Sequence, residues 1–325
     1  MAQIPHIAQT RQKTLRHPLA FVGVGLHCGR KVSMVVRPAG ANAGISFLRK
    51  DLPAGEGLIA ACWHNVVDTE MSTAIGNDYG HTIDTVEHLM AALRGCGVDN
   101  ALVEVDGPEV PIMDGSAEPF VTMIERVGLR EQEALRHAIW IRGRVEVRVG
   151  DRYACLMPAD TPRISVEIDF DNAVVGAQAL SLELLDGVFR RQVAQARTFS
   201  FMNQLAALRQ RGLIKGGSLD NAILVSGDHI VNASGLRYRD EFVRHKMLDC
   251  LGDLALAGAP ILGHYQAYKP GHELNRRLLH ALFEGRGAWS HVAMGAFNVP
   301  TKGGGQHGRQ PGRDVNQRPR MEAAR

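Results

Sequence analysis

A histidine and two aspartates recur at helical spacing in the stretch "RHKMLDCLGD", residues 244–253. If this stretch is a helix, His245, Asp249 and Asp253 stand at i, i+4 and i+8 and line one of its sides. The opposite side is apolar and consists of Val243, Met247, Cys250 and Leu254. A solvated face usually carries Lys/Glu pairs, whereas imidazole beside carboxylate is a metal-binding combination. The stretch indicates a metal site, and a chance histidine on an acidic face is the alternative.

A second histidine beside an acid occurs in "TVEHLMAAL", residues 85–93. Its apolar residues repeat at i, i+3, i+4 and i+7, which predicts an amphipathic helix. His88 lies opposite the apolar stripe and Glu87 lies to one side of it, so this helix's own core needs neither. Thr85 can cap the helix start, and Glu87 then sits in the first turn, where the helix dipole favours a carboxylate. A surface glutamate and a surface histidine are the alternative interpretation.

Together the two stretches supply enough ligands for a catalytic zinc site, which usually takes three protein ligands and keeps one position open. The predicted constellation is His88, His245 and Asp249 on zinc, with Glu87 beside it as a base. Such an ion lowers the pKa of a bound water to about 7, and a nearby carboxylate can take the proton. The HExxH pattern of zinc proteases is absent. Spacing alone does not prove that the two halves meet.

Composition places the chain among globular proteins, with 325 residues of which 45% are hydrophobic and 22% charged. It contains no apolar run long enough for a membrane-spanning helix and no signal-peptide pattern at the N-terminus. Five cysteines without a CxxC motif favour reduced thiols and a cytoplasmic location. The net charge of +3 comes from the tail 301–325, whose six Lys/Arg and two Asp/Glu give +4, so the body carries about −1. We therefore expect no nucleic-acid partner.

Alternating and helical patterns predict an α+β fold. Strands are expected at 31–36, 101–107, 145–150 and 163–170, and helices at 118–128 and 272–285 besides the two above. Strands followed by helices, twice over, suggest two domains of similar layout. We expect an N-terminal α+β domain over 1–128, a charged linker at 129–138, a C-terminal α+β domain over 139–300 and a disordered basic tail over 301–325.

Two further segments show no single helical or strand pattern along their whole length. The stretch 106–120 has three prolines and Asp-Gly turns, which predicts an ordered loop. The stretch 200–225 is expected to begin as a helix, to break at Gly216-Gly217 and to resume as a strand.

Six ordered motifs resemble those of the UDP-3-O-acyl-N-acetylglucosamine deacetylases, the zinc amidases of lipid A biosynthesis in Gram-negative bacteria. They are "TVEHLMAAL", "EVPIMDGSAEPFV", "ARTFSF", "GGSLDNAILV", "DEFVRHKMLDCLGDLAL" and "AYKPGHELN". The resemblance runs from "GVGLHCG" at 23–29 to about residue 298, and the basic tail lies outside it. It implies two similar domains, each a β-sheet packed against helices in a two-layer sandwich, with the active site between them. It also implies hydrolysis of the N-acetyl group of a UDP-linked, 3-O-acylated glucosamine.

Residue by residue, the resemblance implies that Glu87 is the general base and that His88, His245 and Asp249 bind one zinc ion. His272, in "KPGH", would be the general acid. The resemblance gives the remaining residues supporting roles: Asp253 orients His272, Lys246 lies near the substrate, Thr198 helps hold the oxyanion, Phe199 contacts the substrate, and Phe170 and Lys269 lie on the nucleotide side. Without the resemblance, the favoured interpretation of His272 is an ordinary residue at the start of the helix that follows.

The substrate's acyl chain needs an apolar channel, which the segment 200–225 could build. The candidate residues flank its Gly-Gly turn and are Phe201, Met202, Leu205, Ile214, Leu219, Ala222 and Leu224. Leu219 and Ala222 are the preferred channel residues. Ordinary core packing is the alternative for each of the seven.

Three function classes stay open at this point. The first is the zinc deacetylase, with Fe²⁺ as a possible ion in the cell and a monomer implied by the resemblance. The second is a catalytically dead module that binds a sugar nucleotide or lipid, which the intact Glu87, His88, His245, Asp249 and His272 argue against. The third is another metalloenzyme, because two histidines and a carboxylate also hold iron in oxygenases.

Overall fold

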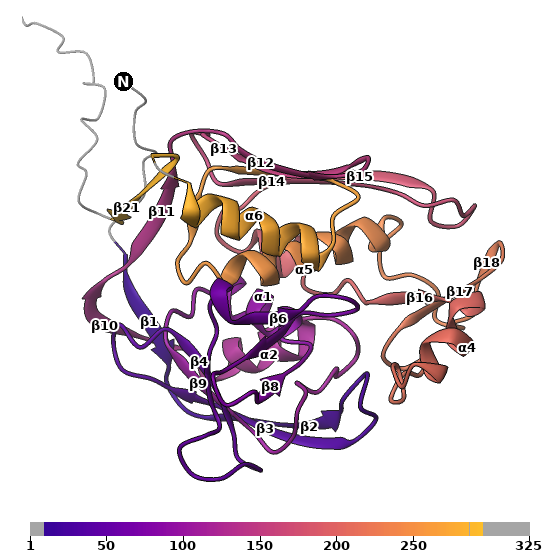
Figure 1. Cartoon of the computed structure of the whole chain (residues 1–325), viewed down its shortest axis with the longest axis horizontal. Coiled ribbons are helices and arrows are strands. Elements are labelled where there is room, and N and C mark those ends of the chain that lie inside the picture. Colours follow the sequence, from indigo (N-terminus) through magenta and orange to yellow (C-terminus); the bar gives the residue numbers. More distant parts are fainter. Residues whose placement is uncertain (1–9, 286, 295–325) are drawn as a thin grey trace, which may run out of the picture.

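The computed structural model describes residues 10–285 and 287–294, and two five-stranded sheets dominate it (Figure 1). In order across the first sheet, the strands are β2 (Leu19–Val24), β3 (Lys31–Pro38), β9 (Ala101–Val105), β4 (Ile45–Arg49) and β5 (Leu58–Ala60). In order across the second, they are β12 (Val145–Val149), β13 (Arg152–Met157), β20 (His264–Tyr268), β14 (Arg163–Asp169) and β15 (Ala177–Glu183). The four predicted strands are thus confirmed as β3, β9, β12 and β14.

The two sheets share one pattern of strand directions. In the first sheet β4 and β9 are parallel, and the other neighbours are antiparallel. In the second sheet β14 and β20 are parallel, and the other neighbours are antiparallel. Each strand of one sheet therefore has a counterpart in the other, in chain order as well as in position.

Helices occupy the space between the sheets (Figure 1). The helices that flank β9 and β20 in the chain are α1 (Glu87–Gly95), α2 (Glu118–Val127), α5 (Glu241–Ala255) and α6 (His272–Glu284). Two shorter ones, α3 (Val188–Gln192) and α4 (Met202–Gln210), lie in the second half, and a 3₁₀ turn covers Trp63–Asn65. The described chain is thus a mixed α+β fold with six α-helices, and none of them is long and apolar enough to span a membrane.

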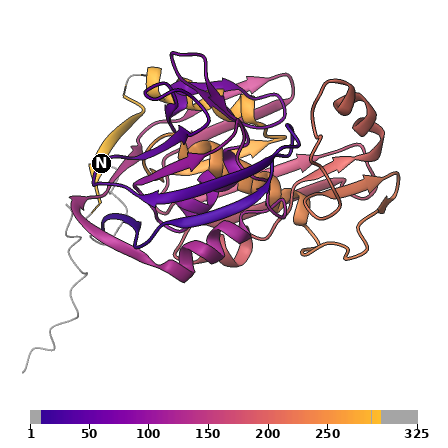
Figure 2. The same cartoon turned by 90° about the horizontal axis from the view of Figure 1, so that it is seen from below.

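Each half carries an extra three-stranded sheet between the fourth strand of its main sheet, β5 or β15, and its central helix, α1 or α5. In the first half it consists of β6 (Val66–Asp68), β7 (Ala74–Gly76) and β8 (Thr82–Ile83). In the second half it consists of β16 (Phe199–Phe201), β17 (Ile223–Ser226) and β18 (His229–Ile230), with α4 between β16 and β17. Figure 2 shows this second insert projecting to one side of the main sheets.

The remaining strands form two small sheets. One pairs β1 (Arg11–Leu15) with β10 (Leu129–Leu135), and the other consists of β19 (Ile261–Leu262), β11 (His137–Ile141) and β21 (Trp289–Ala293). The segment 129–138, expected as a charged linker, consists of β10 and the start of β11. Its charges alternate with half-buried residues because only one of its sides is covered.

Two local predictions are wrong: the helix cap at Thr85 and the position at which the helix in 200–225 ends. Helix α1 begins at Glu87 with no side-chain cap, because Thr85 adopts a left-handed φ of 58° and turns away from the helix. Helix α4 ends at Gln210, well before Gly216-Gly217. The loop expected at 106–120 is confirmed up to the start of α2. The predicted disordered tail 301–325 lies outside the described residues.

Candidate metal centre and active site

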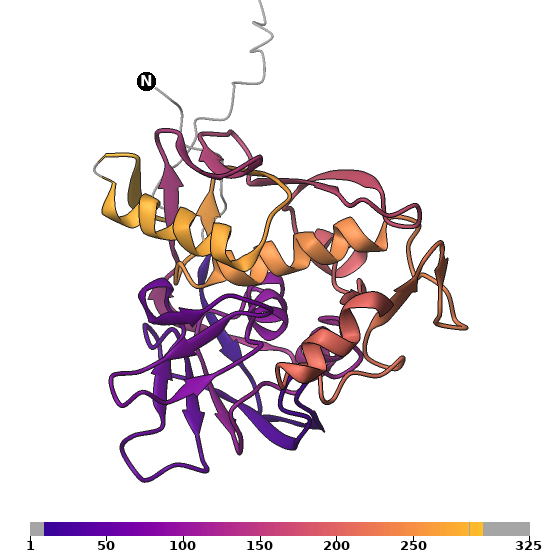
Figure 3. The ribbon, with the colours of Figure 1, turned by 45° about the vertical axis from the view of Figure 1, so that its right-hand side comes forward.

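Helices α1 and α5 pass very close to each other where the two halves meet, as Figure 3 shows. Gly252 of α5 lies against the start of α1, and a methyl group there would overlap the carbonyl oxygen of Glu87. Glycine is required at this position because it lets the two backbones touch. Most of α5 is buried, including His245, Asp249 and Asp253, so these polar side chains must find partners inside the protein.

His88, His245 and Asp249 come together at this crossing, and all three are buried. The Oδ1 atom of Asp249 lies 3.3 Å from Nε2 of His245 and 3.6 Å from Nε2 of His88. Tetrahedral zinc with bonds of about 2.0–2.1 Å places its ligand atoms about 3.3 Å apart, so the spacing of these atoms suits such an ion. The three residues predicted as ligands therefore form a group that could hold a metal.

The protonation of this group also suits a cation. Burial lowers the pKa of His245 to about 3, so its imidazole is neutral. Its Nδ1 lies 3.1 Å from the carbonyl oxygen of Ala196, to which it can donate, and Nε2 then keeps its lone pair toward Asp249. Burial alone would raise the pKa of Asp249, but His245 and Lys246 hold it well below its usual range. Lys246 donates to Oδ2 of Asp249 at 2.7 Å.

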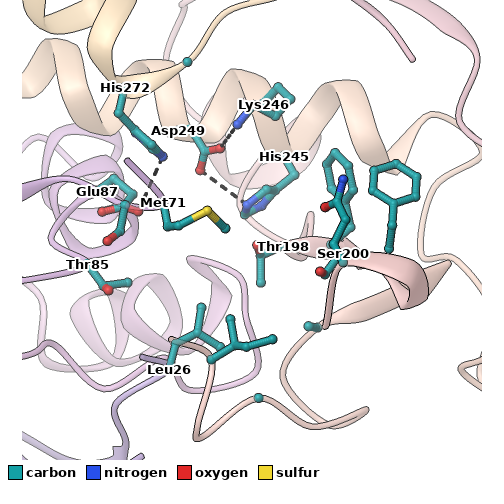
Figure 4. Close-up of a pocket in the computed structure, with 18 of the residues that line it drawn as sticks. Leu26, Met71, Thr85, Glu87, Thr198, Ser200, His245, Lys246, Asp249 and His272 are labelled. Atoms are coloured by element: carbon teal, nitrogen blue, oxygen red, sulfur yellow. Dashed lines mark hydrogen bonds and ion pairs between the residues drawn. The ribbon is translucent and has the colours of Figure 1, made fainter. Parts of the chain in front are cut away.

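Glu87 and His272 form a second pair beside this group (Figure 4). Oε1 of Glu87 lies 3.8 Å from Nε2 of His272, and Oε2 accepts a hydrogen bond of 3.1 Å from the backbone N–H of Thr73. Burial raises the pKa of Glu87 to about 7. Burial acts to lower the pKa of His272, but the charge and hydrogen bond of Asp253 outweigh it and raise that pKa to about 9. Near neutral pH the site thus holds a carboxyl group poised to titrate beside a charged imidazole.

Asp253 lies behind His272 and is fully occupied by hydrogen bonds. Its Oδ2 lies 2.9 Å from Nδ1 of His272 and also accepts from Nδ2 of Asn275 at 2.8 Å. Its Oδ1 accepts from the hydroxyl of Thr73 at 2.6 Å. Thr73 therefore contacts both acids, Asp253 through its side chain and Glu87 through its backbone. Because Asn275 in turn accepts from the hydroxyl of Tyr265, this network continues into the second sheet.

The metal group opens into a cavity of about 900 Å³ (Figure 4). Twelve of the thirteen residues singled out in the sequence line it, namely Glu87, His88, Phe170, Thr198, Phe199, Leu219, Ala222, His245, Lys246, Asp249, Lys269 and His272. The exception is Asp253, which lies behind the wall. Lys269 and His272 both line the cavity, and Lys269 also pairs with Asp151 at 3.0 Å and with Asp169 at 3.2 Å.

One wall of the cavity is apolar and comes from the second insert. It includes six of the seven side chains proposed for a channel, namely Phe201, Leu205, Ile214, Leu219, Ala222 and Leu224. Met202 does not line the cavity and is 43% exposed, because it is the first residue of α4 and turns outward. Phe199 contacts Phe242 edge to face at 4.9 Å, which anchors this wall to α5.

Sequence reasoning missed the loop residues of the site. Asp68 to Ser72 line the cavity from the first insert, and Thr73 and Asn275 orient the two acids. Leu26, Ile112 and Arg152 also line it. No helical or strand spacing links Thr73 to Glu87, so the sequence pattern could not show that the two residues are in contact. Asn275, three residues after His272 on α6, could have been found from its position on the same helix face.

The comparisons with known proteins agree with this geometry. The family model described as "LpxC: UDP-3-O-acyl N-acetylglycosamine deacetylase" matches residues 12–284. A UDP-3-O-acyl-N-acetylglucosamine deacetylase of Phenylobacterium zucineum is 48% identical over 278 residues, which cover 86% of this chain and 95% of the relative. Proteins with the same description from Myxococcus xanthus and Acidithiobacillus ferrooxidans are 50% and 48% identical, over 82% and 89% of this chain and 85% and 95% of their own lengths.

Proposed function

The chain belongs to the UDP-3-O-acyl-N-acetylglucosamine deacetylase family, and from this premise we infer that it is a metal-dependent amidohydrolase of lipid A biosynthesis. Its substrate is UDP-3-O-[(3R)-3-hydroxyacyl]-N-acetylglucosamine, which it hydrolyses at the N-acetyl group to the free amine and acetate, an early committed step. The observation that carries this conclusion is the buried group of His88, His245 and Asp249 directly beside Glu87 and His272.

We propose that His88, His245 and Asp249 hold one Zn²⁺ ion per chain, with Fe²⁺ as the alternative in the cell. Two neutral imidazoles and one carboxylate are a donor set that zinc accepts. Bound there, the ion would lower the pKa of a water molecule and polarise the amide carbonyl. Lys246 keeps the charge of Asp249 balanced and lies at the cavity wall, where it can reach the substrate.

Glu87 is proposed as the general base and His272 as the general acid. Amide hydrolysis needs a group that accepts a proton from the attacking water and one that gives a proton to the leaving nitrogen. A pKa of about 7 suits Glu87 to the first task, and a pKa of about 9 keeps His272 protonated for the second. Asp253 holds Nδ1 of His272, so that Nε2 faces Glu87 and the cavity.

Thr198 is proposed to help hold the developing oxyanion. Its backbone is fixed on both sides, because its N–H donates to Gly115 at 2.8 Å and its carbonyl accepts from Ile223 at 2.8 Å. A hydroxyl held on a rigid backbone toward the cavity can stabilise charge that appears in the transition state at little reorganisation cost.

The rest of the cavity is assigned to the two ends of the substrate. Phe199 is proposed to contact the substrate, and Phe170 and Lys269 are proposed to contact its nucleotide, whose negative charge Lys269 can meet. Leu219 and Ala222 are proposed to contact the acyl chain, together with the other apolar side chains of the second insert. The polar and apolar sides of the cavity match the two chemistries of such a substrate.

The finer architecture is also a proposal. Residues 1–128 and 139–300 would be two similar two-layer domains, with the active site at their interface. The shared strand order of the two main sheets supports this division. The enzyme is further proposed to act as a monomer without a nucleic-acid partner and in the cytoplasm, where its sugar-nucleotide substrate would be made.

The first experiment measures acetate release from UDP-3-O-(3-hydroxyacyl)-N-acetylglucosamine before chelation, after chelation and after zinc is restored. Activity that vanishes with the chelator and returns with zinc is the expected result. Well-folded, zinc-loaded protein that releases no acetate would overturn the enzyme assignment and leave a binding module. Activity that returns with iron but not with zinc would correct the metal.

A further inference from the structure

Thr85, two residues before Glu87, has an unusual backbone conformation. Its φ is 58°, in the left-handed region that β-branched residues rarely adopt. It is also almost fully buried and lies immediately before the turn that starts α1. Such a conformation persists only where the surroundings hold it, and it is typical of functional sites. The contacts that hold Thr85 therefore decide where Glu87 and His88 lie.

Two carboxylates hold Thr85. Its backbone N–H donates to Oδ1 of the preceding residue, Asp84, at 2.7 Å. Its hydroxyl donates to Oε1 of Glu109 at 3.1 Å. Glu109 comes from the loop that follows β9, so it ties the start of α1 to a distant part of the first half. The backbone of the same loop pairs with Asp84, because Val110 donates to the carbonyl of Asp84 at 3.0 Å.

Glu109 is a fully buried carboxylate held by neutral donors. Besides Thr85, its Oε1 accepts from the N–H of His27 at 2.8 Å, and its Oε2 accepts from the N–H of Cys28 at 2.8 Å. A methyl group at Gly25 would overlap this carboxylate, so the loop closes tightly around it. Within the part of the chain that the structure describes, no lysine or arginine pairs with Glu109. The site is thus built to accept hydrogen bonds at both oxygens.

We propose that Glu109 is a positioning residue for the metal centre: by holding the hydroxyl of Thr85, it fixes the left-handed turn that starts α1 and so places Glu87 and His88. The inference rests on the roles proposed for those two residues. Glu109 itself does not line the cavity. Glu109 also holds the backbone of His27, and both His27 and its neighbour Leu26 line the cavity. One carboxylate therefore positions two segments of the site.

The requirement for a carboxylate gives a sharp test. Glu109→Gln keeps the shape but replaces one acceptor by an NH₂ group, which must then face the N–H of either His27 or Cys28. In either orientation the NH₂ group opposes a backbone N–H, so the loop of His27 and Cys28 should move away from the amide and shift the contact with Thr85 and the start of α1. Partners that orient metal ligands typically contribute about 10–100-fold in metal affinity or activity, and we expect losses in that range. Glu104→Gln is the matched control, since Glu104 pairs with Arg37 at the surface of the same half.

The experiment measures two quantities on each purified full-length variant. The first is the zinc dissociation constant, obtained by titrating the metal-free protein against a chromophoric chelator. The second is kcat and KM for acetate release. Glu109→Gln should weaken zinc binding and lower kcat with little change in KM, whereas Glu104→Gln should match the parent in all three.

Variants of Thr85 test whether Glu109 acts through it. Thr85→Ala removes the hydroxyl but leaves the carboxylate its two backbone donors, so it should reproduce the loss even if Glu109→Gln fails to fold. Thr85→Ser keeps the hydroxyl and should lie closer to the parent than Thr85→Ala. In the double variant, Thr85→Ala should add little to Glu109→Gln, because both remove the same contact.

Three results would overturn the inference alone: Glu109→Gln with the parent's zinc affinity and kcat, a lower Tm with both of those unchanged, or losses that multiply in the double variant. The failure of the proposed function looks different, because the parent itself would then bind no zinc or release no acetate. The metal titration therefore separates the two failures.

Discussion

The two halves of the chain use one arrangement of strands and helices but reach the active site in different ways. Each half has four strands, a central helix, a fifth strand between its neighbours and a last helix. From α5 the site takes His245, Asp249 and Asp253, which lie inside a regular helix and away from its first turn. From α1 it takes Glu87 and His88, which are the first two residues of the helix.

This difference decides which parts of the structure must form before the residues of each helix are in place. Residues at i, i+4 and i+8 need only the helix itself to stay aligned. Residues at a helix start also depend on the loop before them, here the left-handed Thr85 and the carboxylates that hold it. The second half thus supplies groups held by a regular helix, and the first supplies groups whose placement depends on long-range loop contacts.

The inserts of the two halves differ in a similar way. The first insert lines the cavity with a mostly polar loop, from Asp68 to Ser72, whereas the second lines it mainly with apolar side chains. Both inserts occupy the same place in the order of elements. The shared scaffold therefore carries His88, His245 and Asp249, whereas the inserts give the cavity its polar and apolar walls.

Removing one group from each central helix should separate metal binding from proton transfer. Asp249→Ala should lose both the metal and activity, because a ligand is gone. Glu87→Ala should keep the metal and lose about 10²–10⁴-fold in kcat, as expected for a general base. Metal content and acetate release are measured on both proteins. Unchanged turnover in Glu87→Ala would remove Glu87 as the base and leave α1 with His88 alone.

The pH profile should show how α5 controls a residue of α6. In the parent, kcat/KM should fall below pH 7 as Glu87 takes a proton and above pH 9 as His272 loses one. Asp253→Asn removes the charge that raises the pKa of His272, so the alkaline limb should move to lower pH. The maximal rate should fall by about 100-fold. An alkaline limb that does not move would mean that another group gives the proton.

The contact between the halves can be tested at Gly252. Gly252→Ala should cost about 1–3 kcal/mol in the free energy of unfolding, because the new methyl group overlaps the start of α1. Gly40→Ala is the control, since a methyl group there meets nothing within 4 Å. Denaturant unfolding of both proteins measures the difference. Equal stability of the two variants would show that α1 and α5 can separate without penalty.

The apolar insert should affect substrate binding more than catalysis. Leu219→Asn should raise KM for a long-acyl substrate by about three- to tenfold, since part of an apolar contact is lost. Leu185→Asn is the control, because Leu185 is similarly exposed but does not line the cavity. Kinetics with long and short acyl chains provide the measurement. The same increase in KM for both chain lengths would argue against an acyl-chain wall.

The smallest effect is expected from the tail, which belongs to neither half. Deleting 301–325 should leave kcat/KM unchanged, because every residue of the site lies before it in the chain. Acetate release by the shortened protein measures this. A large loss would show that the tail takes part in the reaction.

The sequence was most informative where function coincides with regular geometry. Helical spacing alone brought His245 and Asp249 to one side of α5, and both are in the metal group. The same reasoning placed His88 away from the core of its helix, yet His88 is buried, because α5 covers the face opposite the apolar stripe. A single helix pattern cannot reveal a second helix packed on its polar side.

What sequence reasoning missed depends on contacts between distant loops. Thr73 joins Glu87 and Asp253 across 180 residues of chain, and no spacing rule links them. Thr85 reads as a helix cap by residue type, whereas its hydroxyl is taken by Glu109. The strand β10 reads as a linker because its exposed side is charged. Tertiary contacts overrode local preference in each case.

The separation of the ligands along the chain also bears on how the protein is made. His88 and His245 are 157 residues apart (245 minus 88). At a synthesis rate of about 5–20 residues per second, roughly 8–30 s pass between them. During that interval α1 lacks the helix that buries it in the finished protein. His88, His245 and Asp249 therefore cannot come together on the nascent chain until the second half has emerged, so an ion held by all three would bind late in maturation.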